Sequence, residues 1–403
     1  MLHIHFGTGR LGLGLVAPFF KTPTSELFLL NRKVSHGSAT GSTALSPERR
    51  NQLLSEHPDK QYIVQTPDGT ESSRVILHYD DFCAYDEQNL EEIISSILDK
   101  SKQKHEGIVV TGSVLLLANY RSVIQALNIL CDARERDPQA VGKIFLVACE
   151  NTVSAAEIFD EDTLTDLIKP QTRCHVGCVH ALVDRLCVGL EEDTYGAHPT
   201  VRAVAEEYGS LKLQLTDENE SMVEMLRDSR IEFSRHVDTE KQIKSWLLNG
   251  GHWLIALRAF AAVNGDHELK LNHYLKSSPE NMRFAAAVLD EMAEGVAILL
   301  RNNPQYADFV REVDVDDYLK GAKKMILYRF SATDDPITRI LARFRAPTPE
   351  EHTTIEAFNK RFAGRVDEPI MAYEAEKGVI PPASSQSIFS LHRLMATGTF
   401  IHG

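Results

Sequence analysis

Three polar residues that could act together on an alcohol lie close to one another in the second half of the chain. Lys244, Asn249 and His252 belong to the segment Lys-Ser-Trp-Leu-Leu-Asn-Gly-Gly-His. Reducing a ketone or oxidising an alcohol requires one group that exchanges a proton with the oxygen and others that hold its partial charge. An amine, an amide and an imidazole can supply these functions. The alternative is purely structural: a solvated lysine, a helix irregularity and a core histidine beside Trp253.

A helix over residues 239–264 is expected to carry the three groups. The T-x-x-Q pattern from Thr239 to Gln242 is typical of a capping box and predicts that the helix starts there. At about 100° of rotation per residue, the three groups fall within roughly 140° of one another, so they can line one cleft. Gly250 and Gly251 weaken this helix by about 1 kcal/mol each relative to alanine. We therefore expect a ligand or another backbone to approach closely there.

Length and charge restrict the class of protein. A chain of 403 residues is too long for one ordinary core, so two domains are expected. The 43 basic and 57 acidic residues give a net charge of -14, which opposes generic binding to nucleic acid or to an anionic membrane. Neither a membrane-spanning run nor a secretory leader is recognisable, which predicts a soluble cytoplasmic protein. Neither a protein partner nor an oligomeric state follows from the sequence.

The six cysteines are sparse for this length, and reduced thiols are expected. The segment from Cys174 to His180 places two cysteines and two histidines within seven residues, which suggests zinc. The spacing is poor, however, because in an extended segment His175 points away from the other three side chains. We expect no metal site.

The first half of the chain alternates short apolar runs with helical stretches, which is typical of a parallel sheet with crossover helices. The second half shows long helical periodicity, including a buried stripe from Phe284 to Leu299 that is bounded by Pro304. The change in composition places a boundary near residues 233–237 and predicts domains 1–236 and 237–403. The stretch 35–58 is polar and is expected to form an irregular loop. Strands are expected at residues 2–6, 26–30, 107–111, 143–148 and 175–180, with 200–206 as an edge strand; helices are expected at 13–20, 221–229, 239–264, 315–330 and 336–345.

A glycine-rich segment follows the first strand and predicts a dinucleotide site. The pattern G-x-G-x-x-G alone is a weak signal, but here a strand precedes it, a helix follows it and a second strand ends about 20 residues later. The first glycine allows a tight turn, the second lets the backbone approach a pyrophosphate, and the third lets the helix pack on the strand. The helix N-terminus offers its N–H groups to the phosphates. The expected cofactor-binding residues here are Gly7, Thr8, Gly9, Arg10, Leu11 and Gly12.

The end of the second strand bears on the choice between NAD and NADP. An acid that would accept the ribose hydroxyls of NAD is missing there, and the chain reads Asn31-Arg32-Lys33. A neutral side chain followed by two cations suits a 2′-phosphate, so the residues favour NADP. The alternative is that these charges are simply a solvated loop end.

Polar residues at the carboxyl ends of two later strands are further candidates, because ligands of open parallel sheets lie beyond those ends. Thr111, Gly112 and Ser113 end one apolar run and are expected beside the nicotinamide ribose. Glu150 and Asn151 end another run. Glu150 could equally be a first-turn helix acid, and Asn151 a helix cap.

Four separated motifs together resemble the polyol-specific long-chain dehydrogenases, the mannitol dehydrogenase family. The start H-F-G-T-G-R-L-G is similar to the opening of the mannitol-1-phosphate 5-dehydrogenase branch. Ala-Cys-Glu-Asn at 148–151 and Val-Asp-Arg at 183–185 are similar to two further motifs of that branch. The segment from Lys244 to His252 matches the family pattern K-x-x-x-x-N-x-x-H, which is the most specific of the four.

The resemblance implies an α/β architecture, with a Rossmann-like, mostly parallel sheet domain followed by a mostly helical C-terminal domain. It implies metal-independent, NAD(P)-dependent hydride transfer to or from a polyol or polyol phosphate. Lys244 would be the general acid/base, Asn151 and Asn249 would donate to the reacting oxygen, and His252 would contact a substrate hydroxyl.

Other functions stay open. Beyond residue 344 the chain departs from the branch, which leaves Arg361 and Arg365 as the available contacts for a substrate phosphate. Within the enzyme class the alternative substrate is a hexuronate. A different class is a dinucleotide-binding sensor without turnover.

Overall fold

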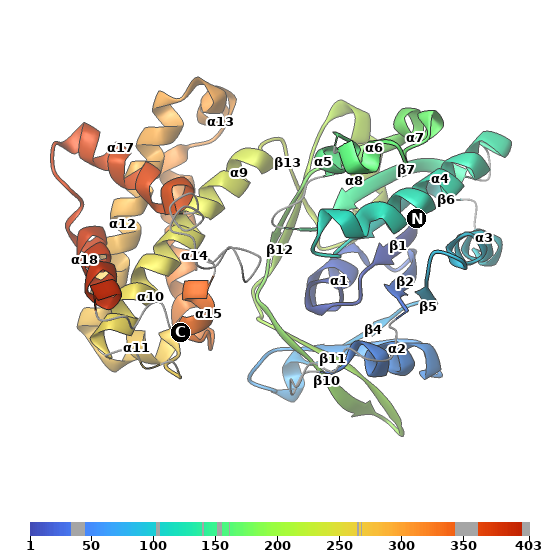
Figure 1. The fold of residues 1–403 in the computed structure, drawn as a ribbon, viewed down its shortest axis with the longest axis horizontal. Helices are drawn as coiled ribbons and strands as arrows, with labels where there is room; N and C mark the ends of the chain where they lie inside the picture. Colours follow the sequence, from blue (N-terminus) through green and yellow to red (C-terminus); the bar gives the residue numbers. More distant parts are fainter. Residues whose placement is uncertain are drawn as a thin grey trace. The chain divides into compact units, whose positions relative to one another are not determined.

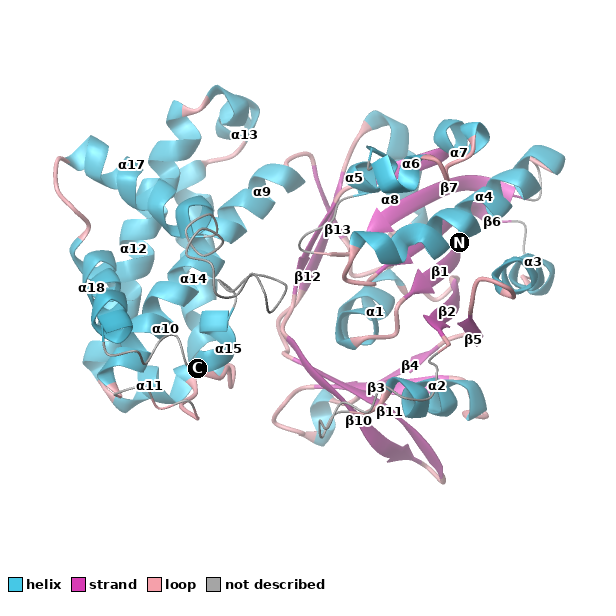
Figure 2. Ribbon diagram, viewed as in Figure 1, coloured by secondary structure: helices cyan, strands magenta, loops and turns pink. Residues whose placement is uncertain are grey.

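The computed structural model describes residues 1–33, 45–101, 105–138, 141–150, 155–160, 162–263, 266, 268–342 and 362–396. The chain divides into two compact units, Met1–Asp238 and Thr239–Gly403. The first unit contains three sheets with helices, and the described part of the second unit is helical (Figures 1 and 2). Within the described residues, no helix combines the length and apolar character needed to cross a membrane.

A six-stranded sheet of parallel strands forms the centre of the first unit. Its order is β5-β2-β1-β6-β7-β8, so successive strands are added on one side of β1 and then, from β6 on, on its other side. This is the dinucleotide-binding Rossmann order 3-2-1-4-5-6. The predicted strands of this sheet are confirmed within two residues at their ends, and β5 is a strand that the sequence analysis did not predict. The strands are β1 (Leu2–Phe6), β2 (Glu26–Arg32), β5 (Asp81–Tyr85), β6 (His105–Gly112), β7 (Val141–Ala148) and β8 (Val176–Val179).

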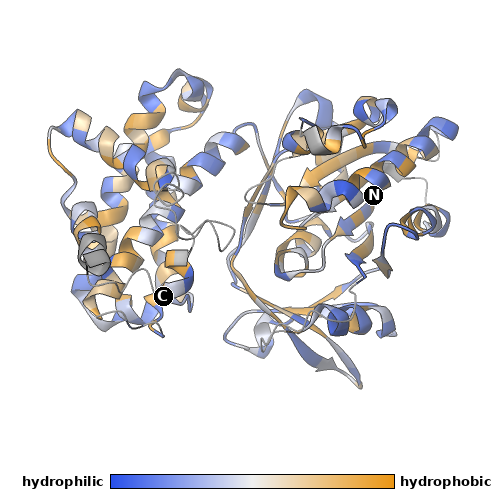
Figure 3. Cartoon of the chain, in the orientation of Figure 1, coloured by the Kyte–Doolittle hydropathy of each residue, from blue (hydrophilic) through white to orange (hydrophobic). Residues whose placement is uncertain are grey.

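Helices cover both faces of this sheet because its strands are apolar on both faces; the hydrophobic colour of β7 in Figure 3 illustrates this. Ile144 and Leu146 of β7 pack in the core that contains α3 and α4, whereas Phe145 and Val147 pack in the core that contains α1 and α8. The period of two residues follows from the pleat of a strand. The helices of this unit are α1 (Ala17–Phe20), α2 (Pro47–Glu56), α3 (Leu90–Lys100), α4 (Arg121–Arg136), α5 (Ala155–Asp160), α6 (Asp162–Thr165), α7 (Pro170–His175) and α8 (Glu220–Met225).

The segment predicted to be an irregular loop contains a helix, α2, so that prediction is wrong for residues 47–56. Ser46 caps α2 by accepting a hydrogen bond from the Arg49 backbone N–H, and Pro47 occupies the first turn. The helix buries Leu53 and Leu54. Residues 35–44 of the same segment lie outside the described residues.

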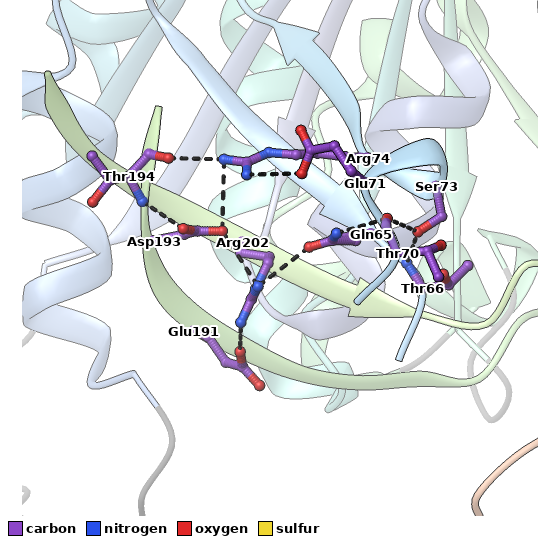
Figure 4. A network of polar contacts seen from close by, with 10 residues as sticks. All are labelled: Gln65, Thr66, Thr70, Glu71, Ser73, Arg74, Glu191, Asp193, Thr194 and Arg202. Atoms are coloured by element: carbon purple, nitrogen blue, oxygen red, sulfur yellow. Dashed lines mark hydrogen bonds and ion pairs between the residues drawn. The ribbon is translucent and has the colours of Figure 1, made fainter. Parts of the chain in front are cut away.

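A second sheet has the order β10-β11-β3-β4 and corrects the prediction of an edge strand at residues 200–206. Strand β11 (His198–Ala205) lies between β10 (Cys187–Tyr195) and β3 (Gln61–Gln65), and β4 (Val75–His78) is at the edge. The polar residues that alternate along β11 belong to a charged network on one face of this sheet (Figure 4). Arg202 pairs there with Glu191 and with Asp193, which lies 3.4 Å from the guanidinium.

A third sheet consists of three short strands in the order β13-β12-β9. Its strands are β9 (Ala181–Asp184), β12 (Ser210–Gln214) and β13 (Glu232–Ser234). Leu211 and Leu213 of β12 are fully buried in the core that also holds Phe19 of α1. This sheet therefore packs on the helix that follows the glycine-rich segment.

The second unit is built around the long helix α12 (Pro279–Asn302), whose predicted buried stripe is confirmed. Val288, Met292 and Val296 are buried, while Phe284 and Leu299 are partly buried against the same core. A Cβ atom at Gly295 would lie 2.7 Å from the Pro369 carbonyl carbon, so this glycine permits close packing of α17. The other helices in the described part of this unit are α9 (Val237–Ile243), η5 (Lys244–Gly250), α10 (Gly251–Ala262), α11 (Leu271–Ser277), η6 (Pro304–Tyr306), α13 (Ala307–Glu312), α14 (Val315–Ala332), α15 (Ile337–Ala342), η8 (Ala363–Asp367), α17 (Glu368–Lys377) and α18 (Pro382–Ala396).

Candidate functional site

The three glycines of the predicted dinucleotide loop differ in what surrounds them. Gly7 has φ +103°, and a Cβ atom there would overlap the Ser113 carbonyl. A Cβ atom at Gly12 would overlap the Gly7 carbonyl and lie 2.5 Å from His5 Nε2. At Gly9, by contrast, a Cβ atom would have no neighbour within 4 Å. Gly7 and Gly12 are thus required by packing inside the chain, whereas Gly9 leaves open space at the carboxyl edge of the sheet.

The loop residue Thr8 supports the fit of a phosphate group. Its hydroxyl oxygen is buried and has no hydrogen-bond partner among the described residues. Buried polar atoms are normally paired, so this hydroxyl needs an explanation such as a bound ligand. Arg10 and Leu11 form the first helical turn beyond the loop, and Leu13 N–H donates to Gly9 O at 3.0 Å. The helix begins earlier than the predicted residue 13.

This helix contains a wider π turn, η1 (Gly12–Val16), which the periodicity did not predict. Pro18 has no N–H to donate to the Gly14 carbonyl, four residues earlier. Arg185 Nη1 donates to that carbonyl instead, at 2.6 Å, and the Tyr62 hydroxyl donates to Leu13 O at 3.0 Å. Arg185, singled out only as part of a Val-Asp-Arg motif, therefore supports the helix that follows the glycine loop.

Two buried histidines of β1 support the glycine loop through a chain of hydrogen bonds. The Gly7 carbonyl can only accept, so His5 Nε2 carries a proton and donates to it at 2.9 Å. His5 Nδ1 then accepts from the Thr111 hydroxyl at 2.6 Å, and His3 Nε2 donates to the same hydroxyl at 2.8 Å. Burial lowers the pKa of His5 to about 4 and that of His3 well below its usual value. Both rings are neutral at pH 7, as this chain of hydrogen bonds requires.

The end of β2 carries the residues that bear on the cofactor. Asn31 accepts a hydrogen bond from Thr8 N–H at 3.5 Å, which ties this strand end to the glycine loop. Lys33 pairs with Asp86 at 2.7 Å, so its charge is balanced within the chain. Arg32 is exposed and hydrogen-bonds the Tyr85 side chain.

Gly112 and Ser113, which are predicted to lie beside the nicotinamide ribose, hold the end of β6 in place. Ser113 donates to the Gly7 carbonyl at 2.9 Å, linking β6 to the glycine loop. A Cβ atom at Gly112 would lie 2.6 Å from the Tyr120 ring, and the Tyr120 hydroxyl donates to Gly112 O at 3.1 Å. Thr111 is fully buried, and its hydroxyl hydrogen-bonds the rings of His3 and His5.

Glu150 lies just beyond the end of β7, whose last residue is Ala148. It is 5% exposed, and its Oε1 accepts a hydrogen bond from Leu115 N–H at 2.6 Å. Burial raises its pKa to about 7, against the effect of hydrogen bonds from the Leu115 and Val114 backbones. Asn151, the predicted donor to the reacting oxygen, lies outside the described residues, as does Arg361.

In the second unit, Lys244, Asn249 and His252 lie on one continuous helix, but its geometry differs from the prediction. The helix begins at Val237, so Thr239 lies inside it and the predicted capping box is wrong. Lys244 and Asn249 belong to the π-helical segment η5, and both are half-buried. A π turn has more residues than an α turn, so the angles estimated for an α-helix do not apply.

His252 is held in the core of the second unit. It is buried, its ring stacks on Phe330 with 3.9 Å between centroids, and its Nε2 lies 3.8 Å from Asp335 Oδ2. Arg339 pairs with the same carboxylate. These contacts orient the imidazole.

Other parts of the protein approach both glycines beside these residues. A Cβ atom at Gly250 would overlap the carbonyl oxygen of Arg365 in η8, and one at Gly251 would lie 2.7 Å from Leu289 Cδ2. The expected approach of another backbone is confirmed for Gly250.

The described residues contain no group of three or more His, Cys, Asp or Glu side chains that could hold a metal ion. In the cysteine and histidine segment, Cys174 lies on α7 and Cys178 on β8. His180 Nδ1 pairs with Asp238 at 3.1 Å.

Comparison with known proteins shows the fold. No protein-family model and no curated protein matches the chain. Among solved structures, the chain is similar to Pseudomonas fluorescens mannitol 2-dehydrogenase in a ternary complex with NAD and D-mannitol, with 15% identity, a TM-score of 0.54, and 96% of this chain and 83% of that chain covered. It is also similar to a D-sorbitol dehydrogenase in substrate-free form, with 12% identity, a TM-score of 0.57, and coverage of 99% and 94%. Both units are thus included in the likeness.

Proposed function

We propose that the chain is an NAD(P)-dependent oxidoreductase that transfers a hydride between nicotinamide and a secondary alcohol of a polyol or polyol phosphate. The observation that carries the proposal is the glycine loop that follows β1, at the reversal of strand order between β1 and β6. Gly7 and Gly12 are closed by packing there, whereas Gly9 faces open space. Nucleotides bind at this reversal of strand order in open parallel sheets. The unpartnered Thr8 hydroxyl supports a phosphate there.

The polyol part of the proposal rests on two supports. One is the K-x-x-x-x-N-x-x-H segment on a continuous helix of the second unit. The other is the likeness to the mannitol and sorbitol dehydrogenase structures over almost the whole chain. When bound, the nicotinamide supplies the acceptor or donor of the hydride.

The residues of this chain handle the substrate oxygen. In the oxidative direction Lys244 takes the hydroxyl proton, so that the carbinol oxygen develops negative charge. Asn151 and Asn249 donate hydrogen bonds to that oxygen, which lowers the barrier because the charge is greatest in the transition state. His252, oriented by Phe330 and the Asp335 carboxylate, binds a neighbouring hydroxyl. None of these roles requires a metal ion.

For the cofactor we propose NADP over NAD. No acid stands at Asn31 to accept the ribose hydroxyls, and the exposed Arg32 is the nearest cation for a 2′-phosphate. The charge of the neighbouring Lys33 is already paired with Asp86. Comparing the dissociation constants of NADPH and NADH tests this choice. Arg32→Ala should weaken NADPH and leave NADH unchanged, and a wild-type preference for NADH would contradict it.

The function is tested with a panel of free polyols, polyol phosphates, the matching ketoses and hexuronates, following the absorbance of the reduced nicotinamide. Lys244→Ala should abolish turnover and leave cofactor binding intact. Lys241→Ala, on the preceding turns of the same helix, is the matched control and should retain turnover. Full activity of Lys244→Ala would refute the assigned mechanism. Turnover of hexuronates alone would change the substrate class, and cofactor binding without any turnover would favour a sensor.

A further inference from the structure

The chain makes a strained turn directly after β6. Leu116 N–H donates to Val114 O at 2.9 Å and closes a three-residue turn around Leu115, whose φ is +69°. Such γ-turns with positive φ are rare and strained. Among the described non-glycine residues, only Lys60 and Leu115 have positive φ. Strain of this kind persists where the surroundings hold it in place, and it gathers at ligand sites.

The side chain of Glu150 stabilises this turn by accepting backbone hydrogen bonds. Its buried carboxylate receives the Leu115 N–H at 2.6 Å and a second backbone hydrogen bond from Val114. From the other side, Asn119 Nδ2 donates to Val114 O at 2.6 Å. Glu150 follows β7, the neighbour of β6 in the sheet, so a single carboxylate ties two adjacent strand ends together.

The turn presents apolar side chains outward at the edge where a dinucleotide would bind. Leu115 is 69% exposed and Leu116 is 55% exposed. Exposed leucines scattered singly need no explanation, but here two adjacent ones stand on a backbone that is held in strain. Ser113, which immediately precedes the turn, bonds the glycine loop itself.

We propose that Glu150 is a positioning residue whose carboxylate holds the turn at Leu115, so that Leu115 and Leu116 cover one face of the nicotinamide ring. This inference rests on the proposed dinucleotide binding. It assigns to Glu150 a role through the turn rather than a direct contact with the cofactor.

The hydrogen bonds that hold the turn at Leu115 should depend on pH, because their strength depends on the charge of Glu150. Burial raises the pKa of Glu150 to about 7. The Tyr120 phenol and the Cys149 thiol interact electrostatically with it; burial raises the pKa of each, so both are neutral at pH 7. The ionised carboxylate accepts the backbone N–H groups strongly above pH 7, and protonation below pH 7 weakens that hold. Affinity for the nicotinamide cofactor should therefore fall as the pH falls through 7.

The test uses Glu150→Gln in the full-length chain, with Asp80→Asn as the matched control. Asp80 also accepts a backbone N–H, from Leu27 at 2.7 Å, but at the opposite end of the sheet. We expect Glu150→Gln to speed amide hydrogen exchange in residues 113–116, to raise the NAD(P)H dissociation constant about tenfold, and to remove its pH dependence around 7. Its melting temperature should not fall, because the substitution removes a buried charge. Asp80→Asn should leave the exchange of this segment and the cofactor affinity unchanged.

ADP-ribose, which lacks the nicotinamide ring, separates the possible outcomes. Leu115→Ala should weaken NAD(P)H and leave ADP-ribose unchanged. Faster exchange in Glu150→Gln with unchanged NAD(P)H affinity would overturn the inference and leave the proposed function intact. Equal weakening of NAD(P)H and ADP-ribose in Leu115→Ala would also overturn it. If the wild-type chain bound no dinucleotide at all, the proposed function itself would fail.

Discussion

Alanine substitutions at Gly9 and at Gly12 should separate cofactor binding from folding. At Gly9 the new methyl group meets no protein atom within 4 Å, and the backbone is outside the positive-φ region. Such a substitution stabilises a protein by about 0.4–1 kcal/mol through the unfolded state. At Gly12 the methyl group overlaps the Gly7 carbonyl and lies 2.7 Å from Ser113 Oγ. Overpacking of this kind costs about 1–3 kcal/mol.

The two substitutions therefore predict opposite signs in thermal unfolding. For a unit of this size, 1 kcal/mol shifts the melting temperature by roughly 2–4 °C, so Gly12→Ala should lower it by roughly 2–12 °C. Gly9→Ala should leave it unchanged or slightly raised. Cofactor binding should be weakened in both variants. For Gly9→Ala the methyl group occupies the approach of the pyrophosphate, and a cost of about 1.4–3 kcal/mol raises the dissociation constant roughly 10- to 150-fold.

The assay combines a thermal melt without ligand and a fluorescence titration with NADPH and NADH on the same preparations. Wild-type affinity in Gly9→Ala would refute the placement of the pyrophosphate at Gly9. A loss of stability in Gly9→Ala equal to that in Gly12→Ala would refute the statement that the space at Gly9 is open in the absence of ligand.

Two further predictions concern the support of the loop. Arg185→Met removes the side-chain donor to the buried Gly14 carbonyl, so the free energy of unfolding should fall by about 1–3 kcal/mol and cofactor affinity should fall with it; unchanged denaturant midpoints would contradict the assigned contact. His5 has a folded-state pKa of about 4 against an ordinary value of 6.5, so the stability it contributes is complete above pH 6.5 and is lost as the pH falls towards 4. The loss amounts to about 3 kcal/mol. The difference in unfolding free energy between wild type and His5→Asn should narrow by this amount between pH 7 and pH 4, and a constant difference would contradict the neutral, buried imidazole.

Most of the central sheet could be predicted from the sequence because its strands are buried on both faces and read as apolar runs, but β5, which begins at Asp81 and is only partly buried, could not. The glycine loop could be predicted because its strand, glycines and helix are contiguous. The second sheet could not, since β3 pairs with β11 far along the chain, with Ile63 opposite Arg202. The polar alternation of β11 resembles that of an edge strand until its charged partners are seen.

Parts of the candidate site could not be predicted for a similar reason. The π turn after the loop receives a hydrogen bond from Arg185, which is distant in sequence from Pro18. Glu150 was identified as a polar strand end, but its partner Leu115 and the strained turn have no sequence signal that periodicity detects. Among the supporting residues that the sequence analysis missed, His5 had the clearest sequence signal. His3 and His5 occupy alternate positions of one strand, so their side chains share a face and require a polar partner there.

Transfer of deuterium tests hydride transfer most directly. NADPH or NADH carrying deuterium at both C4 positions is incubated with the chain and the ketose or ketose phosphate that turns over in the panel, and the product is analysed by mass spectrometry and NMR. We predict a polyol with one deuterium on the new carbinol carbon, and no such product from Lys244→Ala. A product without deuterium at that carbon, or no product from any ketose although the cofactor binds, would contradict the proposed function.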